Sequence, residues 1–207
     1  NVRYDHAINS ENDVKVIFNA SKSDAEQADS FRNEENVKNG STDASDNAGY
    51  FAALEKTDVS RKFDYSRLSA EFNNYSYDNL EISLTPYVRY NRNRYVATWT
   101  PNLASNDNKI YTFGLMQKNT YDASWGRLIA GFDSEYTQST LLYNQDFDLS
   151  SRGKNYTAGA LYDYGVTYMA IAPYVHSEFD LTKTLRLNAG LRYDYNADQI
   201  VDSTDAQ

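Results

Sequence analysis

The stretch LRLNAGLRYD at residues 185–194 decides the fold, because its side chains alternate between two chemical classes. The even positions hold arginine, asparagine, glycine or aspartate, whereas the odd positions hold Leu185, Leu187, Ala189, Leu191 and Tyr193. Successive side chains of a β-strand point to opposite faces of a sheet, so a period of two predicts a strand with one apolar and one polar face.

The same alternation recurs along the chain and predicts about eight antiparallel strands. After a partial strand at the start, we expect strands at Val14–Ala20, Arg67–Phe72, Glu81–Trp99, Ile110–Lys118, Arg127–Tyr143, Tyr168–Phe179 and Leu185–Tyr193. Short turns are expected at Asn73–Asn79, Asn119–Gly126 and Asp180–Thr184, and longer polar loops at Ser21–Asp58, Pro101–Asn108 and Asn144–Tyr164. Short and long connections therefore lie at opposite ends of the predicted sheet.

The composition narrows the class of protein. The 207 residues carry a formal net charge of -9, which argues against nucleic acid as a partner because phosphates require clustered Lys and Arg. The chain has no Cys, so neither disulfides nor thiolate metal sites support it. Its 19 Tyr favour strands, and tyrosine rings also suit the headgroup level of a bilayer.

Two architectures could use such strands, a soluble sandwich or a membrane barrel. No apolar run reaches the roughly 18 residues that a transmembrane helix needs. A strand over Glu81–Trp99 exceeds the about 9 to 11 residues of one bilayer crossing, so its excess would project into water. Together with the unequal connections, this favours an all-β, antiparallel transmembrane β-barrel segment over a sandwich.

Several segments resemble the barrel strands of TonB-dependent outer-membrane receptors. The longest is IAPYVHSEFDLTKTLRLNAGLRYDY at Ile171–Tyr195, which resembles a recurring strand-turn-strand unit of that family. FDYSRLSAEF at Phe63–Phe72, the strand end near Tyr87–Pro101, and RLIAGFD at Arg127–Asp133 resemble others. The resemblance covers most of the chain except the loops, and it depends on the order and spacing of these segments together.

The resemblance implies a barrel of about 22 strands whose lumen is filled by a plug domain. Residues 1–207 would then form about a third of the barrel, and both ends of the chain are expected to be cut within it. Such receptors sit in outer-membrane lipid, bind an iron chelate, cobalamin, haem or a glycan, and import it with energy relayed by TonB through the plug. The resemblance implies no resident cofactor.

Candidate ligand-binding residues combine cations with aromatic rings, which suit an anionic chelate or a sugar. They are Arg89, Tyr95 and Trp99 on the polar face of one strand, and Arg152, Lys154 and Tyr156 in the last long loop. The alternative is that arginines on this face pair with carboxylates or with the plug.

No catalytic or metal-binding motif is found, so we expect neither an enzyme nor a metal site. His6 and His176 are isolated in the sequence, and the region of Asp146 and Asp148 lacks the glycine and the bidentate glutamate of a calcium loop. Asp133 and Glu135 share a strand face and could form an acid-base pair, although a polar barrel wall also explains them.

Two other functions remain open at this point. One is a different outer-membrane barrel, such as a small porin or adhesin, in which the first and last strands would pair. The other is an all-β glycan-active enzyme, which would gather titratable groups in a closed pocket.

Overall fold

The computed structural model shows an all-β chain with antiparallel pairing throughout the described residues, which are 1–26, 57–98, 100, 102–151 and 153–202. The strands are β1 (Val2–Ala7), β2 (Asn12–Glu26), β3 (Ser60–Tyr77), β4 (Leu80–Val96), β5 (Ser105–Ala123), β6 (Gly126–Gln145), β7 (Leu149–Ser151), β8 (Lys154–Tyr156), β9 (Gly159–Thr182), β10 (Leu185–Arg192) and β11 (Tyr195–Asp202). No helix among these residues is long and apolar enough to cross a membrane.

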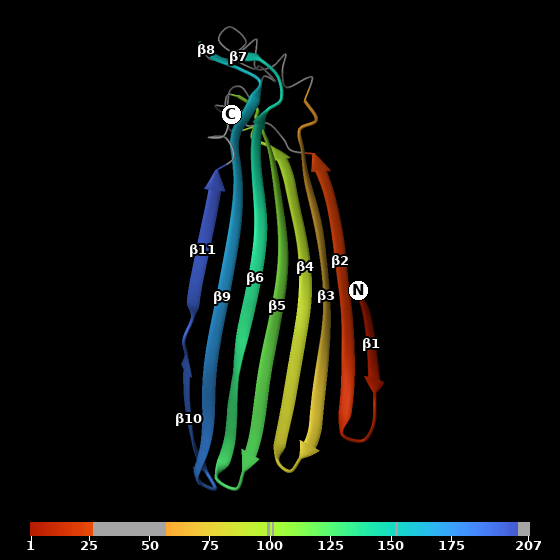
Figure 1. The fold of residues 1–207 in the computed structure, drawn as a ribbon, viewed down its shortest axis with the longest axis vertical. Helices are drawn as coiled ribbons and strands as arrows, with labels where there is room; N and C mark the ends of the chain where they lie inside the picture. Colours follow the sequence, from red (N-terminus) through yellow and green to blue (C-terminus); the bar gives the residue numbers. More distant parts are fainter. Residues whose placement is uncertain (27–56, 99, 101, 152, 203–207) are drawn as a thin grey trace, which may run out of the picture.

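Nine of these strands form one sheet in the order β1-β2-β3-β4-β5-β6-β9-β10, with β11 also paired to β9 (Figure 1). β10 and β11 lie end to end along β9, so the sheet is eight strands wide, as the alternation predicted. The sheet is not closed, because its edges at β1 and at β10 and β11 have no partner strand within the described chain. β7 and β8 form a separate hairpin.

The unequal connections predicted from the sequence are confirmed. At one end, the lower end of Figure 1, the turn between β3 and β4 contains only Asp78 and Asn79, and the turn between β5 and β6 only Ser124 and Trp125. Asn79 has a φ of 60°, a left-handed conformation that asparagine tolerates in tight turns. The longer connections 97–104 and 146–158 join strands at the upper end, where β2 also ends and β3 begins.

The predicted strands were too short at both ends. The turns expected at Asn73–Asn79 and Asn119–Gly126 lie mostly within β3 and β5, and the 105–108 and 159–164 parts of two expected loops belong to β5 and β9. β11 was not predicted at all. Strand segments with water on both faces keep their backbone pairing but lose the apolar alternation by which they would be recognised. Residues 27–56 of the loop expected at Ser21–Asp58 lie outside the described residues.

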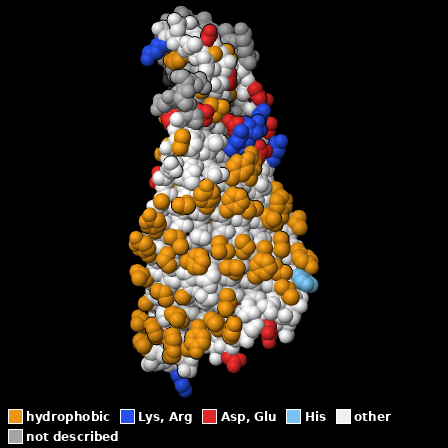
Figure 2. All heavy atoms as spheres, viewed as in Figure 1, with side chains coloured by type: hydrophobic (Ala, Val, Ile, Leu, Met, Phe, Trp, Pro, Cys, Tyr) orange, Lys and Arg blue, Asp and Glu red, His pale blue; other side chains and the backbone are white. Residues whose placement is uncertain are grey.

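One face of the sheet, the apolar face, carries large exposed hydrophobic side chains in register across the strands. A single row of paired residues consists of Phe18, Leu68, Val88, Phe113, Tyr136 and Met169. These side chains are between 37% and 56% exposed, so a broad hydrophobic surface is open to the surroundings, as Figure 2 shows in orange. An exposed apolar area of this extent indicates an apolar partner.

The hydrophobic surface forms a band of limited height, the apolar band. It extends along β4 from Leu80 to Tyr90, along β5 from Tyr111 to Tyr121, and along β9 from Met169 to Phe179, which is about 11 residues or about 36 Å on each strand. Gln117 and Asn119 interrupt it and hydrogen-bond to each other at 2.7 Å. We call the part of the sheet beyond Tyr90 the upper extension.

The opposite face, the polar face, is the more enclosed one. The buried residues in the lower part of the sheet are Asn73, Ser83, Thr112 and Ala172, and all four have the parity of the polar face. In a single-layer sheet, side chains crowd together on the concave side and spread apart on the convex side. The sheet therefore curves with its polar face inside, in the sense that a barrel wall requires.

At the upper end the connections pack around a small hydrophobic cluster. Val96, Leu103 and Leu149 are buried there, and Phe147 and Tyr156 pack against them. This cluster holds the β7-β8 hairpin against the end of β4.

Candidate functional site

A hydrogen-bonded network spans four strands on the polar face at the height of the apolar band. The Tyr87 hydroxyl on β4 donates to Glu135 on β6 at 2.8 Å, and an Arg89 Nη lies 3.3 Å from the same carboxylate. Thr137 also donates to Glu135, at 3.0 Å, and the Arg67 guanidinium on β3 lies 4.4 Å from the centre of the Tyr87 ring. The network ties neighbouring strands together and leaves Glu135 neutralised by Arg89.

Tyrosine rings on this face cover glycines on the neighbouring strand. A Cβ on Gly114 would lie 2.1 Å from Tyr87 Cζ, so the ring occupies the space that any larger residue would need. Tyr174 similarly places its hydroxyl 2.9 Å from a Cβ built on Gly131. Such aromatic cover compensates for the missing side chain of a strand glycine, so these pairs fix the sheet at mid-height.

A row of tyrosines lies higher on the polar face, in the upper extension. Tyr95, Asn106, Tyr143 and Tyr162 are paired in register across β4, β5, β6 and β9. The Tyr143 and Tyr162 rings stack with centroids 5.9 Å apart, and Tyr162 stacks on Tyr164 at 5.7 Å. We call Tyr95, Tyr143, Tyr162 and Tyr164 the tyrosine row.

Amides and a hydroxyl lie just below the tyrosine row, and one charged residue stands at each of its two ends, Arg61 beside Tyr95 and Asp202 beside Tyr164. The register places Asn93 beside Asn108 and Asn91 beside Ile110, and Ser139 Oγ lies 3.2 Å from Asn108 Oδ1. The Arg61 guanidinium lies 5.5 Å from the centre of the Tyr95 ring. Aromatic rings bordered by amides and hydroxyls can stack on a flat ligand and hydrogen-bond to its edge.

The structure does not bring the predicted ligand-binding residues into one cluster. Arg89 belongs to the mid-height network, six residues below Tyr95 on the same strand, or about 20 Å. Tyr95 lies in the tyrosine row, whereas Lys154 is exposed on β8 and Tyr156 packs on the upper hydrophobic cluster. Trp99 and Arg152 lie outside the described residues.

Tyr162 and Tyr164 were missed because their segment was interpreted as loop, whereas Tyr143 lay at the end of a predicted strand. The expected loop Asn144–Tyr164 contains both Tyr162 and Tyr164. The signal was present in LYDYGVTY at 161–168, where tyrosine recurs at every second position apart from Val166. Because the intervening residues are not uniformly apolar, the alternation did not stand out.

The two carboxylates considered for acid-base chemistry have separate cationic partners. Arg192 Nη1 donates to Asp133 at 2.6 Å, while Glu135 contacts Arg89 and Tyr87. His176 lies 3.7 Å from Glu178, and the His6 ring stacks on Tyr4. Within the described residues, no three His, Cys, Asp or Glu side chains are grouped so as to hold a metal ion.

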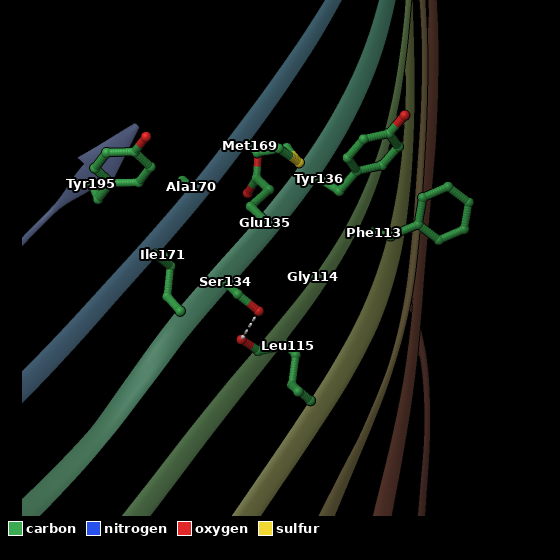
Figure 3. Close-up of a pocket in the computed structure, with 10 residues that line it drawn as sticks. All are labelled: Phe113, Gly114, Leu115, Ser134, Glu135, Tyr136, Met169, Ala170, Ile171 and Tyr195. Atoms are coloured by element: carbon green, nitrogen blue, oxygen red, sulfur yellow. Dashed lines mark hydrogen bonds between the residues drawn. The ribbon is translucent and has the colours of Figure 1, made fainter. Parts of the chain in front are cut away.

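The apolar face also contains a shallow hollow of about 500 Å³ (Figure 3). Ser134 is the small residue at its centre, and its hydroxyl donates to the Leu115 carbonyl at 3.5 Å. Larger side chains border it, among them Phe113, Tyr136, Met169, Ile171 and Tyr195. The hollow follows from one small residue among large ones on a hydrophobic surface.

Comparison with known proteins identifies no family for this chain. No protein-family model matches the sequence. A search of curated proteins also finds no matching relative.

Proposed function

We propose that this chain is a segment of a transmembrane β-barrel of the bacterial outer membrane. The observation that carries the proposal is the apolar band. Within the described residues, no Asp, Glu, Lys or Arg lies on the apolar face between the lower turns and Tyr90. About 11 residues per strand, tilted at about 35–45°, give a band of about 25 to 30 Å, which matches the hydrocarbon thickness.

The backbone pairing supports the same proposal. Lipid supplies no hydrogen-bond partners, so strands in a bilayer must satisfy one another in a closed sheet. The edges at β1 and at β10 and β11 would therefore pair with further strands, as in a barrel of about 22 strands. The short turns would face the periplasm and the long connections the outside, as in other outer-membrane barrels.

The function that fits this arrangement best is reception and uptake of a small nutrient, as in TonB-dependent receptors. The tyrosine row would line the outer part of the lumen, above the network of Tyr87, Arg89 and Glu135. A ligand arriving from outside would meet aromatic rings and amides there before it reached the charged wall below. Iron chelates, cobalamin, haem and glycans all offer surfaces that such groups can contact.

Cysteine accessibility tests the membrane position directly, because the native chain has no Cys. We expect Leu84→Cys, on the apolar face at mid-band, to resist a charged maleimide in intact cells and in isolated membranes. Lys154→Cys, at the upper end, should react in intact cells. Asp78→Cys, in a lower turn, should react only after the outer membrane is permeabilised.

The proposal fails if Leu84→Cys reacts as readily as Lys154→Cys under all these conditions. Detergent-denatured protein serves as the control, since every cysteine should then react equally. Reaction of Asp78→Cys in intact cells, with Leu84→Cys protected, would instead reverse the proposed orientation.

The receptor function is tested by uptake. We expect cells lacking this protein to lose uptake of one member of a panel of a ferric chelate, cobalamin, haem and a maltodextrin. Tyr162→Ala should then reduce uptake of that nutrient at least tenfold at limiting concentration. Tyr77→Ala, at the lower end, is the matched control and should not reduce it. Unchanged uptake of the whole panel would contradict a receptor role.

A further inference from the structure

Charged side chains on the apolar face are confined to the upper extension. Within the described part of the sheet, every lysine and arginine with the parity of this face lies on β2 to β5 beyond Tyr90; they are Lys22, Lys62, Arg92, Arg94 and Lys109. Figure 2 shows Lys, Arg, Asp and Glu side chains gathered above the hydrophobic surface. These cations lie on the apolar face, which would face away from the lumen, so contact with a ligand in the lumen does not explain them.

The register sorts these charges into two rows at different heights. The lower row pairs Lys22, Asp64, Arg92 and Lys109 across four strands. The next row pairs Asp24, Lys62, Arg94 and Asp107. Three cations and one carboxylate make the lower row positive by two charges, whereas the next row has two of each. The positive row is therefore the one nearer to the apolar band.

The partners of the lower row leave two of its cations available. Asp64 is directed to the row above, 3.6 Å from Arg94, and Arg92 Nε donates upward to Asp107 at 2.8 Å. Lys22 and Lys109 make no ion pair with any residue that the structure describes. Within the described part of the sheet, neither ammonium group is held in a direct ion pair, although Lys109 stands two residues from Asp107 on the same face.

The lower row lies just above the apolar band, at the height expected for the bilayer surface. Arg92 follows Tyr90 by two residues, or about 7 Å along the strand, and Lys109 precedes Tyr111 by the same number. The Tyr90 and Tyr111 rings contact each other, with centroids 4.9 Å apart. Tyrosines mark the level where hydrocarbon meets headgroups, so the lower row stands at the level of the lipid phosphates.

The lower end of the sheet has no equivalent row. Arg127 and Arg186 near the short turns have the parity of the polar face and pair with Asp122 and Asp180. Lys183 lies within the turn between β9 and β10. The cations on the apolar side are thus specific to one surface of the membrane.

We propose that Lys22, Arg92 and Lys109 bind the phosphates of lipid headgroups that carry a net negative charge, in the outer leaflet. The inference rests on the proposed membrane position and goes beyond it by naming a lipid class and three residues. Ammonium and guanidinium groups at this level can each contact a phosphate oxygen, and the adjacent apolar band takes up the acyl chains. A zwitterionic headgroup balances its phosphate with a cation of its own, so a headgroup with net negative charge suits the two lysines better.

The test is lipid selectivity of the purified protein in bilayers of phosphatidylcholine containing about 10% spin-labelled phosphatidylglycerol or spin-labelled phosphatidylcholine. We expect the native protein to hold the anionic label in its motionally restricted shell in preference to the neutral one. The triple variant Lys22→Gln, Arg92→Gln, Lys109→Gln should lower this preference at least about fivefold, the factor expected when about one cation's attraction is lost.

A matched triple variant, Lys118→Gln, Lys154→Gln, Lys183→Gln, removes the same charge elsewhere and should keep the preference. Equal loss in both variants, or equal preference in the native protein and the row variant, would overturn the inference. Abolition of the preference by 50 mM inorganic phosphate would also overturn it, because the site would then recognise free anions. Failure of Leu84→Cys to be protected would instead contradict the membrane position itself.

Discussion

The apolar band and the upper extension are made from the same strands, but their side chains of apolar-face parity differ in chemistry. Below Tyr90 this face is hydrophobic and free of charge, whereas above it Arg92 and Arg94 stand at the same parity as Val88. The backbone pairing is continuous through the change. The difference shows that the environment, and not the strand itself, selects the side chains.

The polar face changes less between the two parts. It carries the network of Tyr87, Arg89 and Glu135 below and the tyrosine row above, both of which suit an aqueous interior. Under the proposed membrane position, the apolar face would mark the boundary between lipid and water, and the polar face would line the interior. The two predictions with the largest effects test these faces separately.

Leu84→Arg should produce the largest loss of stability, because it places a charge at the middle of the apolar band. We expect about 2–4 kcal/mol of destabilisation in bilayers. Leu142→Arg, on the same side in the upper extension, should change stability by less than about 0.5 kcal/mol. Urea unfolding of the two variants in lipid vesicles measures the difference, and similar costs at both positions would abolish the distinction between the two parts.

The sequence predicted the lower part of the sheet far better than the upper part. Alternation at Leu185–Tyr193 and Leu68–Phe72 correctly located strands because one face touches an apolar phase and the other does not. The eight-strand width and the unequal connections followed from it. Above the band the two faces are no longer sharply divided into apolar and polar, so the extension of β9 to Gly159 left no comparable pattern. β11, which was not predicted, begins beside Ile171 within the band and continues above it.

The candidate site was predictable only in part. The polar parity of Arg89 and Tyr95 was read correctly, but cross-strand neighbours depend on register, which a single sequence does not give. Tyr143 and Tyr162 become neighbours because β6 and β9 pair across a connection of 13 residues, 146–158. The cationic row is likewise a product of register, since its members are far apart in sequence.

Gly114→Ala should have the next largest effect, and it tests how the lower part is held on the polar face. The new Cβ would meet the Tyr87 ring, so the ring must move and lose its hydrogen bond to Glu135. We expect a loss of about 1–3 kcal/mol by urea unfolding. Gly165→Ala, in the upper extension, has only the Val201 carbonyl oxygen near, at 4.0 Å, and should cost less. Equal costs would mean that the tyrosine cover does not distinguish the two parts.

The smallest effect concerns the ion pair of Arg92 and Asp107 in the upper extension, where water reaches the charges. The hydrogen bond from Arg92 lowers the pKa of Asp107, so the pair stabilises the folded state above the ordinary carboxyl pKa of about 3.9. This contribution should disappear as the pH falls through the lowered pKa of the folded state. Asp107→Asn should therefore cost about 0.5–1 kcal/mol at pH 7, and this cost should shrink as the pH is lowered below the ordinary carboxyl pKa.

Salt provides the second arm of this experiment, because solvent-exposed pairs are screened and charges in hydrocarbon are not. Raising the salt concentration to about 1 M at pH 7 should reduce the cost of Asp107→Asn toward zero. The cost of Leu84→Arg should hardly change under the same conditions, since it arises from transfer of a charge into lipid. If both costs fell together with salt, the apolar band would be in contact with water, and the boundary placed at Tyr90 would not exist.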